Sequence, residues 1–326
     1  MSFKAIIPAA GEGRRLKPHT VSTPKVLLQV AGKPIIGHIM DRLLPARPDE
    51  VCVVIGAQGE QVRGYLEGNY QCRFSFVTQE NPLGLGDAVY RARAVFKPGD
   101  SALIVLGDTI VDLDMREMVG VTDLLAVRSV EDPRRFGIVE TEGDRVMRLV
   151  EKPEHPRGNL AIVGLYYLKD ASRLFASIER LIAENRTTRG EYQLTDALQL
   201  LLEGGADMRT KTIEHWLDCG TRDAMIETNR HLLSRDGHFR PRPDTVVIPP
   251  VFIHDSARIV NSVIGPNVSV GADADISGSV ISDSIINDRV VVEHSLLAGS
   301  ILGEDSIVRD SPRRLNLGGF SELEMG

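Results

Sequence analysis

The sequence is poor in cysteine and has no long apolar run, and each shortage excludes a class of protein. Its three cysteines, Cys52, Cys72 and Cys219, have no CxxC spacing and are odd in number. We therefore expect neither a disulfide framework nor a cysteine zinc site. No segment approaches the roughly 20 apolar residues of a membrane span, and residues 3–10 are too short for the apolar core of a signal peptide. These absences favour a cytoplasmic protein without a membrane partner.

Positive charge is also in short supply. The chain has 38 Lys and Arg against 45 Asp and Glu, a net charge of -7, so it lacks the general basic footprint of a nucleic-acid-binding protein. Any nucleotide must then be bound by a few local cations. The 326 residues, 42% of them hydrophobic, suffice for one large α/β domain and a second module.

Two common phosphate-binding motifs are missing from the glycine-rich segment 9–25, AAGEGRRLKPHTVSTPK. GxxxxGK[ST] is absent, and the pair Gly11 and Gly13 lacks the third glycine of a dinucleotide loop. The segment does have glycines that let backbone N–H groups approach a phosphate, and the cations Arg15 and Lys25, which suit a polyphosphate. Phosphate binding is thus favoured, and a surface loop with solvated cations is the alternative.

Apolar runs alternate with amphipathic segments through the first third of the chain. Strands are expected at 51–56, 73–77 and 102–106, and helices at 35–44, 58–67 and 87–96. This alternation predicts an α/β fold with a mostly parallel, Rossmann-like sheet covered by helices on both faces, with ligands at the carboxyl ends of the strands. Strand-like stretches between 124 and 168 predict an insertion beside this half, and 171–183 is expected to be an amphipathic helix.

Polar residues follow three of the predicted strands. Gln79 begins the segment QENPLGLGDA, in which Gly84 would let a flat base lie against the backbone while the Gln79 amide offers a donor and an acceptor. Asp108 and Asp218 each follow an apolar strand, and an acid in this position is a good ligand for Mg²⁺ bridging phosphate oxygens. The alternatives are a loop with a helix-start glycine at Gly84 and a helix N-cap at Asp108.

The last quarter of the chain is repetitive. Residues 236–245 have the glycine, prolines and scattered charge of a linker. After them aliphatic residues recur every five or six positions, at 253, 259, 264, 270, 276, 281, 286, 292, 297, 302 and 308. This period is too short for a helical repeat and predicts a parallel β-helix with triangular coils; an antiparallel sandwich is the alternative.

Taken together, these motifs resemble those of the sugar-1-phosphate nucleotidyltransferases. The match comprises Gly11, Gly13, Arg15, Leu16, Pro18, Thr20, Pro24 and Lys25, with Arg14 where the family usually carries Thr, and it continues with Glu151-Lys152-Pro153 and with WLDCGT at 216–221. The repeats are similar to the left-handed hexapeptide-repeat β-helix found behind several of these enzymes.

The resemblance implies a role for each motif residue. It implies catalytic roles for Arg15 and Lys25, and Mg²⁺ ligation by Asp108 and Asp218. The implied nucleotide-binding residues are Ala10, Gly11, Gly13, Gln79 and Gly84. The implied sugar-phosphate-binding residues are Gly137, Glu151, Lys152 and Arg189, and Asn159, Glu191 and Thr195 lie in the same neighbourhood. The alternative is that Thr195 or Asp196 caps the helix that begins there.

The expected organisation follows from the resemblance and the repeats. We expect a catalytic domain at 1–236, a linker at 237–245, a left-handed β-helix at 246–310 and a C-terminal tail at 311–326. The implied reaction transfers a nucleotidyl group from dTTP or UTP to a sugar 1-phosphate, glucose 1-phosphate above all, in a homo-oligomer.

Several alternatives stay open. The chain could be a bifunctional uridylyltransferase and acetyltransferase acting on amino-sugar phosphates, with His254 or His294 in the acetyl transfer. It could also be a mannose-1-phosphate guanylyltransferase or a catalytically silent regulatory homologue. A metal-dependent glycosyltransferase is disfavoured because Gly107-Asp108-Thr109 is not a DxD motif.

Overall fold

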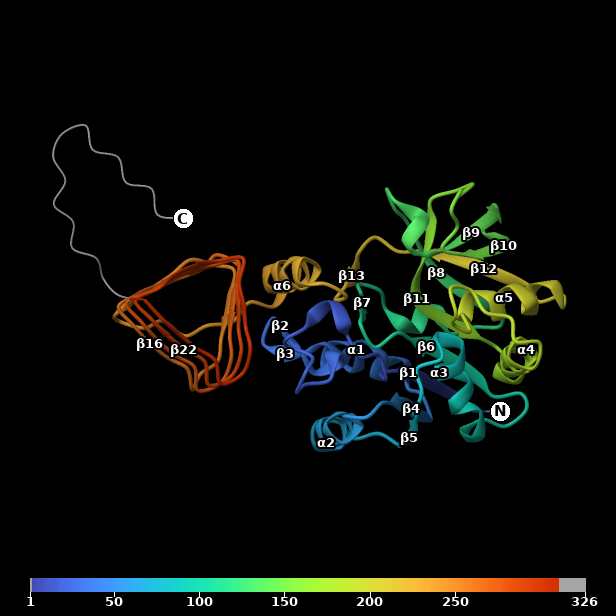
Figure 1. Ribbon diagram of the computed structural model, residues 1–326, viewed down its shortest axis with the longest axis horizontal. Helices are drawn as coiled ribbons and strands as arrows, with labels where there is room; N and C mark the ends of the chain where they lie inside the picture. Colours follow the sequence, from blue (N-terminus) through green and yellow to red (C-terminus); the bar gives the residue numbers. More distant parts are fainter. Residues whose placement is uncertain (1, 311–326) are drawn as a thin grey trace. The chain divides into compact units, whose positions relative to one another are not determined.

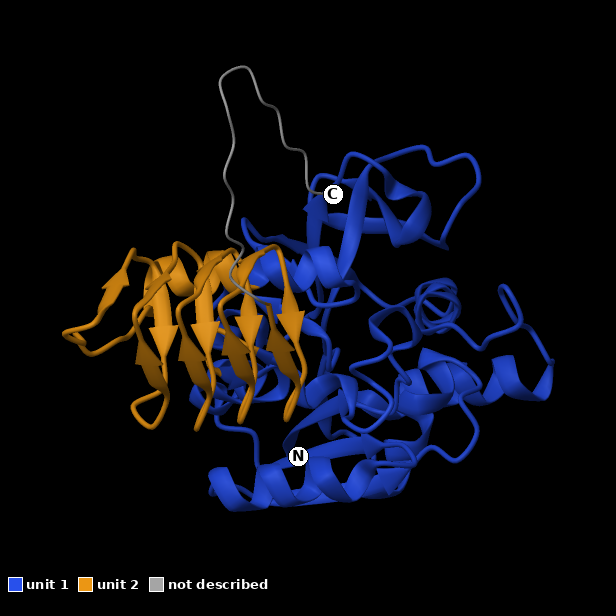
Figure 2. Ribbon diagram, turned by 60° about the vertical axis from the view of Figure 1, so that its left-hand side comes forward, with its two compact units in different colours: residues 1–29, 33–228 blue, residues 30–32, 229–326 orange. Residues whose placement is uncertain are grey.

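The chain divides into two compact units. The computed structural model describes residues 2–310. Unit 1 comprises residues 1–29 and 33–228, and unit 2 comprises residues 30–32 and 229–326 (Figure 2). The division falls within helix α6 (Arg222–Asp236). The tail expected at 311–326 lies outside the described residues.

A nine-stranded sheet forms the centre of unit 1, in the order β5-β4-β1-β6-β11-β8-β12-β10-β9 (Figure 1). Its strands are β1 (Phe3–Pro8), β4 (Glu50–Ile55), β5 (Phe74–Thr78), β6 (Ser101–Val105), β8 (Asp123–Ser129), β9 (Gly137–Glu142), β10 (Arg145–Glu151), β11 (Leu160–Leu168) and β12 (Met208–Thr212). The strands β5, β4, β1 and β6 are parallel neighbours, as the alternating pattern predicts. Beyond β6 the sheet is mixed, because β11 runs antiparallel to both β6 and β8. The strands expected as an insertion therefore extend the same sheet.

Helices cover both faces of this sheet. They are α1 (Ile35–Leu43), α2 (Gly59–Asn69), α3 (Leu85–Arg91), α4 (Ala171–Ala183) and α5 (Leu194–Glu203). Right-handed crossovers place α1 and α2 on one face and α3 on the other, where α4 and α5 pack beside it. Buried residues alternate along β1, with Ile6 facing the α3 side and Ala5 and Ile7 the opposite side. None of the helices in residues 2–310 is long and apolar enough to cross a membrane.

The short elements of unit 1 complete its loops. They are η1 (Arg14–Leu16), η2 (Lys25–Leu27), β3 (Lys33–Pro34), η3 (Leu44–Ala46), η4 (Ala92–Val95), β7 (Thr109–Val111), η5 (Met115–Met118), η6 (Pro133–Arg135) and β13 (Trp216–Asp218), while β2 (Gln29–Val30) lies at the boundary between the units.

Burial raises the pKa of the Cys52 and Cys219 thiols to about 12. Both cysteines are therefore inert core residues.

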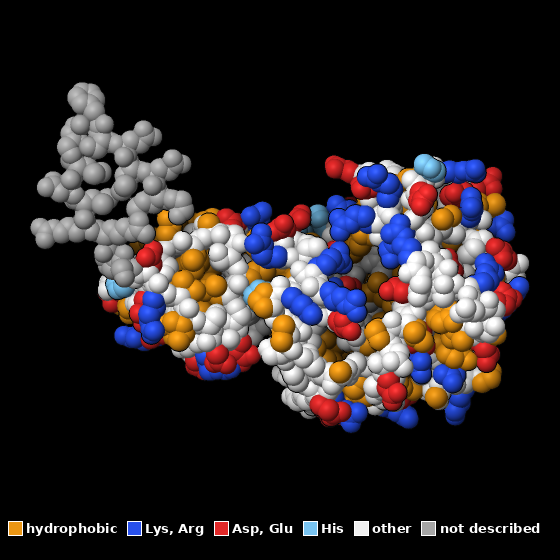
Figure 3. All heavy atoms as spheres, in the orientation of Figure 1, with side chains coloured by type: hydrophobic (Ala, Val, Ile, Leu, Met, Phe, Trp, Pro, Cys, Tyr) orange, Lys and Arg blue, Asp and Glu red, His pale blue; other side chains and the backbone are white. Residues whose placement is uncertain are grey.

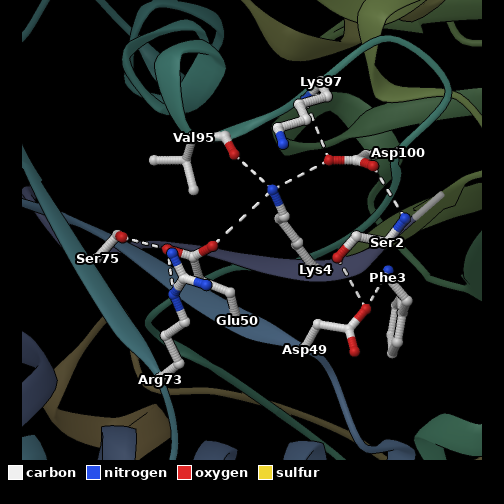
Figure 4. A network of polar contacts seen from close by, with 10 residues as sticks. All are labelled: Ser2, Phe3, Lys4, Asp49, Glu50, Arg73, Ser75, Val95, Lys97 and Asp100. Atoms are coloured by element: carbon white, nitrogen blue, oxygen red, sulfur yellow. Dashed lines mark hydrogen bonds and ion pairs between the residues drawn. The ribbon is translucent and has the colours of Figure 1, made fainter.

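At the amino-terminal edge of the parallel strands, charged side chains are buried and paired with one another (Figure 4). Lys4 is 7% exposed, and its Nζ lies 3.0 Å from Asp100 and 3.9 Å from Glu50. Glu50 also accepts a hydrogen bond from Ser75. Burial by itself would raise the pKa of Asp100, but hydrogen bonds from the Lys97 N–H, the Lys4 ammonium and the Ser2 N–H outweigh it and lower the pKa to about 2.

Three parallel sheets make up the repeat region of unit 2, and they form a prism with a triangular cross-section (Figure 1). The first holds β14 (Thr245–Val247), β17 (Ser262–Ile264), β20 (Val280–Ser282) and β23 (Leu296–Ala298). The second holds β15 (Val251–Ile253), β18 (Val268–Val270), β21 (Ile285–Ile286) and β24 (Ile301–Leu302). The third holds β16 (Arg258–Val260), β19 (Asp275–Ser277), β22 (Val291–Glu293) and β25 (Ile307–Arg309).

The periodic aliphatic residues fill this prism. Equivalent residues stack in register from coil to coil, as in the ladder Ile264 to Ile281 to Leu297. The predicted positions 253, 259, 264, 270, 276, 281, 286 and 292 are all at most 4% exposed. The sequence prediction of a left-handed hexapeptide-repeat β-helix fits this arrangement, and the alternative of an antiparallel sandwich is wrong because neighbouring strands are parallel.

The three sides of the prism differ in what covers them. Within unit 2, α6 packs on the second sheet's side, where Asn229 donates to the Asn267 carbonyl and Arg230 pairs with Asp283. The third sheet carries charge pairs such as Arg258 with Asp275. The strands of the first sheet contain no charged residue. Its outward column instead consists of aliphatic residues in register: Val246, Val263, Val280 and Leu296.

Candidate active site

The glycine-rich loop is folded back on itself after β1. Gly13 adopts a left-handed conformation with φ 60°, and a Cβ there would lie 2.8 Å from Thr20 Cγ2 and 3.0 Å from Lys25 Cβ. The Thr20 hydroxyl donates to the Gly13 carbonyl at 2.9 Å. Only glycine tolerates both the conformation and the contact. Gly13 therefore packs directly against Thr20 and Lys25, which explains the spacing of the three residues in the sequence. This packing places Lys25 against the loop.

Lys25 is directed at Asp108. The Lys25 side chain is 9% exposed and its ammonium hydrogen-bonds to the Asp108 carboxylate, which is 35% exposed. Asp108 stands between β6 and β7, so the alternative of a helix N-cap is wrong. The preceding Gly107 allows this approach, because a Cβ there would lie 2.6 Å from the Pro8 carbonyl oxygen. A buried cation and a carboxylate therefore meet at the carboxyl ends of β1 and β6.

The second acid reaches the same place through the small sheet of β7 and β13. Asp218 pairs with Thr109 across this antiparallel ladder, and the Cys219 N–H donates to the Asp108 carbonyl at 3.0 Å. Burial and the neighbouring Asp108 carboxylate raise the pKa of Asp218, while the nearby cations Lys25 and Arg15 oppose the shift. Two acids that are 110 positions apart in the sequence thus interact electrostatically.

Arg15 completes this cluster. A Cβ at Gly220 would lie 2.8 Å from Asp218 Oδ1 and 2.9 Å from Arg15 Nη2. The guanidinium and the Asp218 carboxylate therefore flank the same glycine. Arg15, Lys25, Asp108 and Asp218 form what we call the charge cluster.

The charge cluster suits a divalent cation that is shared with a phosphate. The Asp108 carboxylate raises the cost of ionising Asp218, and a cation between the two carboxylates would offset that cost. No group of three or more potential metal-ligating side chains occurs among residues 2–310. The two aspartates could therefore hold a hard cation such as Mg²⁺ when ligand oxygens complete its coordination.

A cavity of about 460 Å³ lies on one side of the charge cluster. All the predicted nucleotide-binding residues line it, together with Lys25 and Asp108: Ala10, Gly11, Gly13, Gln79 and Gly84. Gly84 has φ 114°, and a Cβ there would lie 2.6 Å from the Tyr192 carbonyl oxygen. The Gly84 backbone is thus held against the segment before α5. The predicted nucleotide residues are brought together in one cavity, which we call the base cavity.

A second cavity, of about 530 Å³, lies on the other side. Its lining contains all the predicted sugar-phosphate residues and three members of the charge cluster: Gly137, Glu151, Lys152, Arg189, Arg15, Asp108 and Asp218. Asp108 lines both cavities. We call the second one the sugar cavity, and Figure 3 shows Lys and Arg side chains gathered around this hollowed face of unit 1.

The floor of the sugar cavity is tightly packed around Gly137. The Thr195 hydroxyl donates to Glu151 Oε2 at 2.7 Å, and a Cβ at Gly137 would lie 2.6 Å from that hydroxyl and 3.1 Å from that carboxylate oxygen. The suggestion that Thr195 or Asp196 caps α5 is wrong, because the N-cap is Gln193 and no side chain caps this helix. Thr195 instead orients Glu151.

Two cations of the sugar cavity have an uncommon backbone. Lys152 has φ 42° and Arg189 has φ 56°, values that residues with a Cβ rarely adopt. The Arg189 guanidinium donates to the Lys152 carbonyl at 3.3 Å, and the Lys152 ammonium lies 3.0 Å from Glu151. Such conformations concentrate at functional sites, where surrounding contacts hold them in place.

The sugar cavity also has lining residues that the sequence does not predict, among them a cation and two aromatic residues. Arg135, Phe136 and Trp216 line the sugar cavity, and the two aromatic rings make an edge contact with centroids 4.9 Å apart. The Trp216 Nε1–H is buried and has no hydrogen-bond partner among the described residues. The start of the WLDCGT motif at Trp216 was the available signal. Asn159, by contrast, lines neither cavity and binds the Ser129 hydroxyl at 2.7 Å.

Comparison with known proteins shows which family the chain belongs to. Residues 4–235 match the family model described as "Nucleotidyl transferase". The chain belongs to this nucleotidyltransferase family. It is 33% identical over 303 residues to a glucose-1-phosphate thymidylyltransferase of Streptomyces antibioticus, covering 86% of this chain and 81% of the relative.

Two further proteins are similar over about three quarters of the chain. The bifunctional protein GlmU of Methanococcus maripaludis is 33% identical over 234 residues, covering 71% of this chain and 54% of the relative. A crystal structure from Bacillus anthracis, provisionally described as a glucose-1-phosphate thymidylyltransferase, superposes with a TM-score of 0.64 at 27% identity. The match covers 74% of this chain and 98% of that structure.

Proposed function

We propose that this nucleotidyltransferase transfers a nucleotidyl group from dTTP or UTP to glucose 1-phosphate, releasing pyrophosphate. The observation that carries this proposal is the meeting of the base cavity and the sugar cavity at Asp108, with both acids and both cations of the charge cluster beside them. The similarity to a glucose-1-phosphate thymidylyltransferase over most of both chains supports the choice of substrates.

The proposed mechanism consists of alignment and charge neutralisation. A sugar phosphate is already ionised at neutral pH, so no general base is needed for its oxygen to attack the α-phosphorus. Lys152 and Arg189 hold this phosphate, and Glu151 accepts hydrogen bonds from sugar hydroxyls. Arg15 and Lys25 neutralise charge that develops on the phosphoryl and leaving groups.

Mg²⁺ is the metal we propose for Asp108 and Asp218, since hard carboxylate and phosphate oxygens are its preferred ligands. The two aspartates would hold it, and when bound it would supply charge neutralisation to the phosphates. We expect the purified protein to be inactive after EDTA treatment and to regain activity on addition of Mg²⁺.

Pyrophosphate release from a panel of substrates tests the proposal. Each of dTTP, UTP, GTP and CTP is combined with the 1-phosphates of glucose, mannose and N-acetylglucosamine in the presence of Mg²⁺. We expect release with dTTP or UTP and glucose 1-phosphate. Preference for GTP with mannose 1-phosphate would replace the proposal with a guanylyltransferase, and no release from any pair would favour a silent regulatory homologue.

The bifunctional alternative has less support in the repeat region. The relative that is bifunctional is matched over 54% of its length. His254 bonds the Ser256 hydroxyl at 2.8 Å, and His294 Nδ1 would lie 2.6 Å from a Cβ at Gly278, so both histidines are engaged in local packing. Consumption of acetyl-CoA with an amino-sugar phosphate would restore this alternative.

We also propose that the chain forms a homo-oligomer through the uncharged side of the β-helix, with a second copy as the occupant. Leu296 is 81% exposed, Val246 58% and Val280 44% in this aliphatic column. Copies that each carry a net charge of -7 repel one another least where their strands carry no charge.

Light scattering after size-exclusion chromatography tests this assembly. We expect an oligomer that dissociates in Leu296→Asp. The matched control is Ile307→Asp. Ile307 is likewise an exposed aliphatic residue, with 58% of it accessible, but it lies on the third sheet, which carries charge pairs. A monomeric wild type, or equal dissociation of both variants, would contradict the proposal.

A further inference from the structure

The amide of Gln79 is held in one orientation by the protein. Gln79 follows β5 and is 7% exposed, and its Nε2 donates to Asp87 Oδ2 at 2.8 Å and to the Gly84 carbonyl at 3.2 Å. A primary amide has two N–H donors, so both are used within the protein. Among residues 2–310, no hydrogen bond is made to Gln79 Oε1, although Gln79 lines the base cavity.

Asp87 dictates this orientation. It lies in the first turn of α3 and is 2% exposed. Arg91, one turn later, donates to Asp87 Oδ1 from Nε at 3.1 Å and from Nη2 at 2.9 Å. The carboxylate is thereby kept as a pure acceptor, with Oδ1 bound to Arg91 and Oδ2 facing Gln79. A reversed Gln79 amide would oppose its oxygen to the Asp87 carboxylate and the Gly84 carbonyl, so the assignment of nitrogen and oxygen follows from chemistry.

The consequence is that Gln79 offers the base cavity an acceptor and no donor. Uracil and thymine carry N3–H, a donor, on their pairing edge. Cytosine has the same ring and size, but its N3 is an acceptor. An acceptor facing an acceptor leaves two desolvated polar atoms without a hydrogen bond, which disfavours binding.

We propose that Asp87 is a positioning residue for base specificity, which fixes Gln79 as an acceptor and so selects nucleotides with an imide N–H over cytidine nucleotides. This inference rests on the proposed function, because it takes the base cavity as the site of the nucleobase. Asp87 acts through Gln79 and has no contact with the reacting atoms.

The test is a change of preference between UTP and CTP in Asp87→Asn. The variant keeps the shape of the side chain. Arg91 can only donate hydrogen bonds, so it retains the oxygen of the new amide at position 87. The nitrogen of that amide then faces Gln79 as a donor. A turned Gln79 amide would accept from this new donor but would oppose the Gly84 carbonyl, so the protein no longer favours one orientation throughout. We expect wild type to bind UTP at least about tenfold more tightly than CTP, and D87N to lose most of this preference.

Equilibrium binding by calorimetry, with Mg²⁺ and no sugar phosphate, is the readout, because it does not depend on turnover. Asp87→Ala frees the Gln79 amide and is expected to bring the UTP to CTP ratio close to one. Arg91→Lys is the matched control: it disturbs the same ion pair but keeps Asp87 an acceptor, so the wild-type ratio should persist.

The outcomes are distinguishable. An unchanged ratio in D87N and D87A, or an equal loss of the ratio in R91K, would overturn the inference. Wild-type protein that binds CTP as well as UTP would overturn it too. A preserved UTP preference with no pyrophosphate release on glucose 1-phosphate would reject the proposed function while leaving the role of Asp87 in place.

Discussion

The two ends of the parallel strands in unit 1 both carry buried charge, but they use it differently. At the amino-terminal edge, Lys4 is enclosed by Asp100 and Glu50, and each charge is paired within the protein. At the carboxyl edge, Lys25 pairs with Asp108, but a second carboxylate, Asp218, faces Asp108 beside two open cavities. Mutual pairing of charges indicates a structural role, whereas like charges facing a cavity indicate a missing ligand.

The largest effect should come from the carboxyl edge. Replacing Lys25 with Ala removes the cation on Asp108, and we expect turnover to fall about 10³-fold with little change in thermal stability. Steady-state pyrophosphate release and thermal unfolding measure the two quantities. The control is Lys211→Ala, which removes an exposed pair with Glu117 and should leave turnover as it is. Full activity in K25A would contradict its catalytic role.

The opposite result is expected at the amino edge. Lys4→Met leaves Asp100 and Glu50 buried without their cation, which should cost about 3 kcal/mol of unfolding free energy while turnover per folded molecule is retained. Urea unfolding followed by circular dichroism measures the loss. Lys33→Ala, which breaks a half-exposed pair with Asp41, should cost less than about 1 kcal/mol. Equal losses in the two variants would remove the distinction between the edges.

A smaller effect is expected from Gly84→Ala in the base cavity. The new Cβ meets the Tyr192 carbonyl and the left-handed backbone is strained, so the nucleotide KM should rise about tenfold, equivalent to roughly 1.4 kcal/mol. The kcat for bound substrate should change less. Gly64→Ala is the control, because its Cβ projects from α2 into open space. An unaltered KM in G84A would place the nucleotide elsewhere.

The smallest effect is a pH dependence at the amino edge. The folded-state pKa of Asp100 is about 2, below the ordinary value of 3.8, so the unfolded chain binds its proton first as pH falls. The contribution of Asp100 to stability is therefore complete above about pH 4 and is lost between about pH 4 and pH 2. We expect the stability difference between wild type and Asp100→Asn to shrink from pH 5 to pH 3. A constant difference would show that Asp100 is not stabilised as a carboxylate.

Much of this site could be predicted from the sequence because its motifs are local. Gly13, Thr20 and Lys25 lie on one loop, and Asp108 and Asp218 each follow an apolar strand. The helix at 171–183 was predicted with the bounds that α4 has, and the aliphatic period of the repeats predicted the coils. In each case a short-range pattern carries the information.

Other features depend on contacts between distant segments, which no local pattern encodes. The pairing of β7 with β13 brings Asp218 to Asp108, and β11 turns the sheet from parallel to mixed. Lys4 looks like an ordinary strand residue until Asp100 is placed beside it. Asp87, although only eight residues from Gln79, also looks like a common acid in a first helical turn until the loop between β5 and α3 is folded.

The stacked coils of the β-helix constrain how this half can change in length. Val246, Val263, Val280 and Leu296 occupy equivalent places in successive coils, at intervals of 17, 17 and 16 residues. A turn between strands therefore absorbs a difference of one residue while the later side chains keep their columns. Whole coils could likewise be added or removed, because each coil contacts only its neighbours. The β-helix is thus a spacer whose length along its axis changes in complete coils, whereas small changes in chain length are confined to the corners.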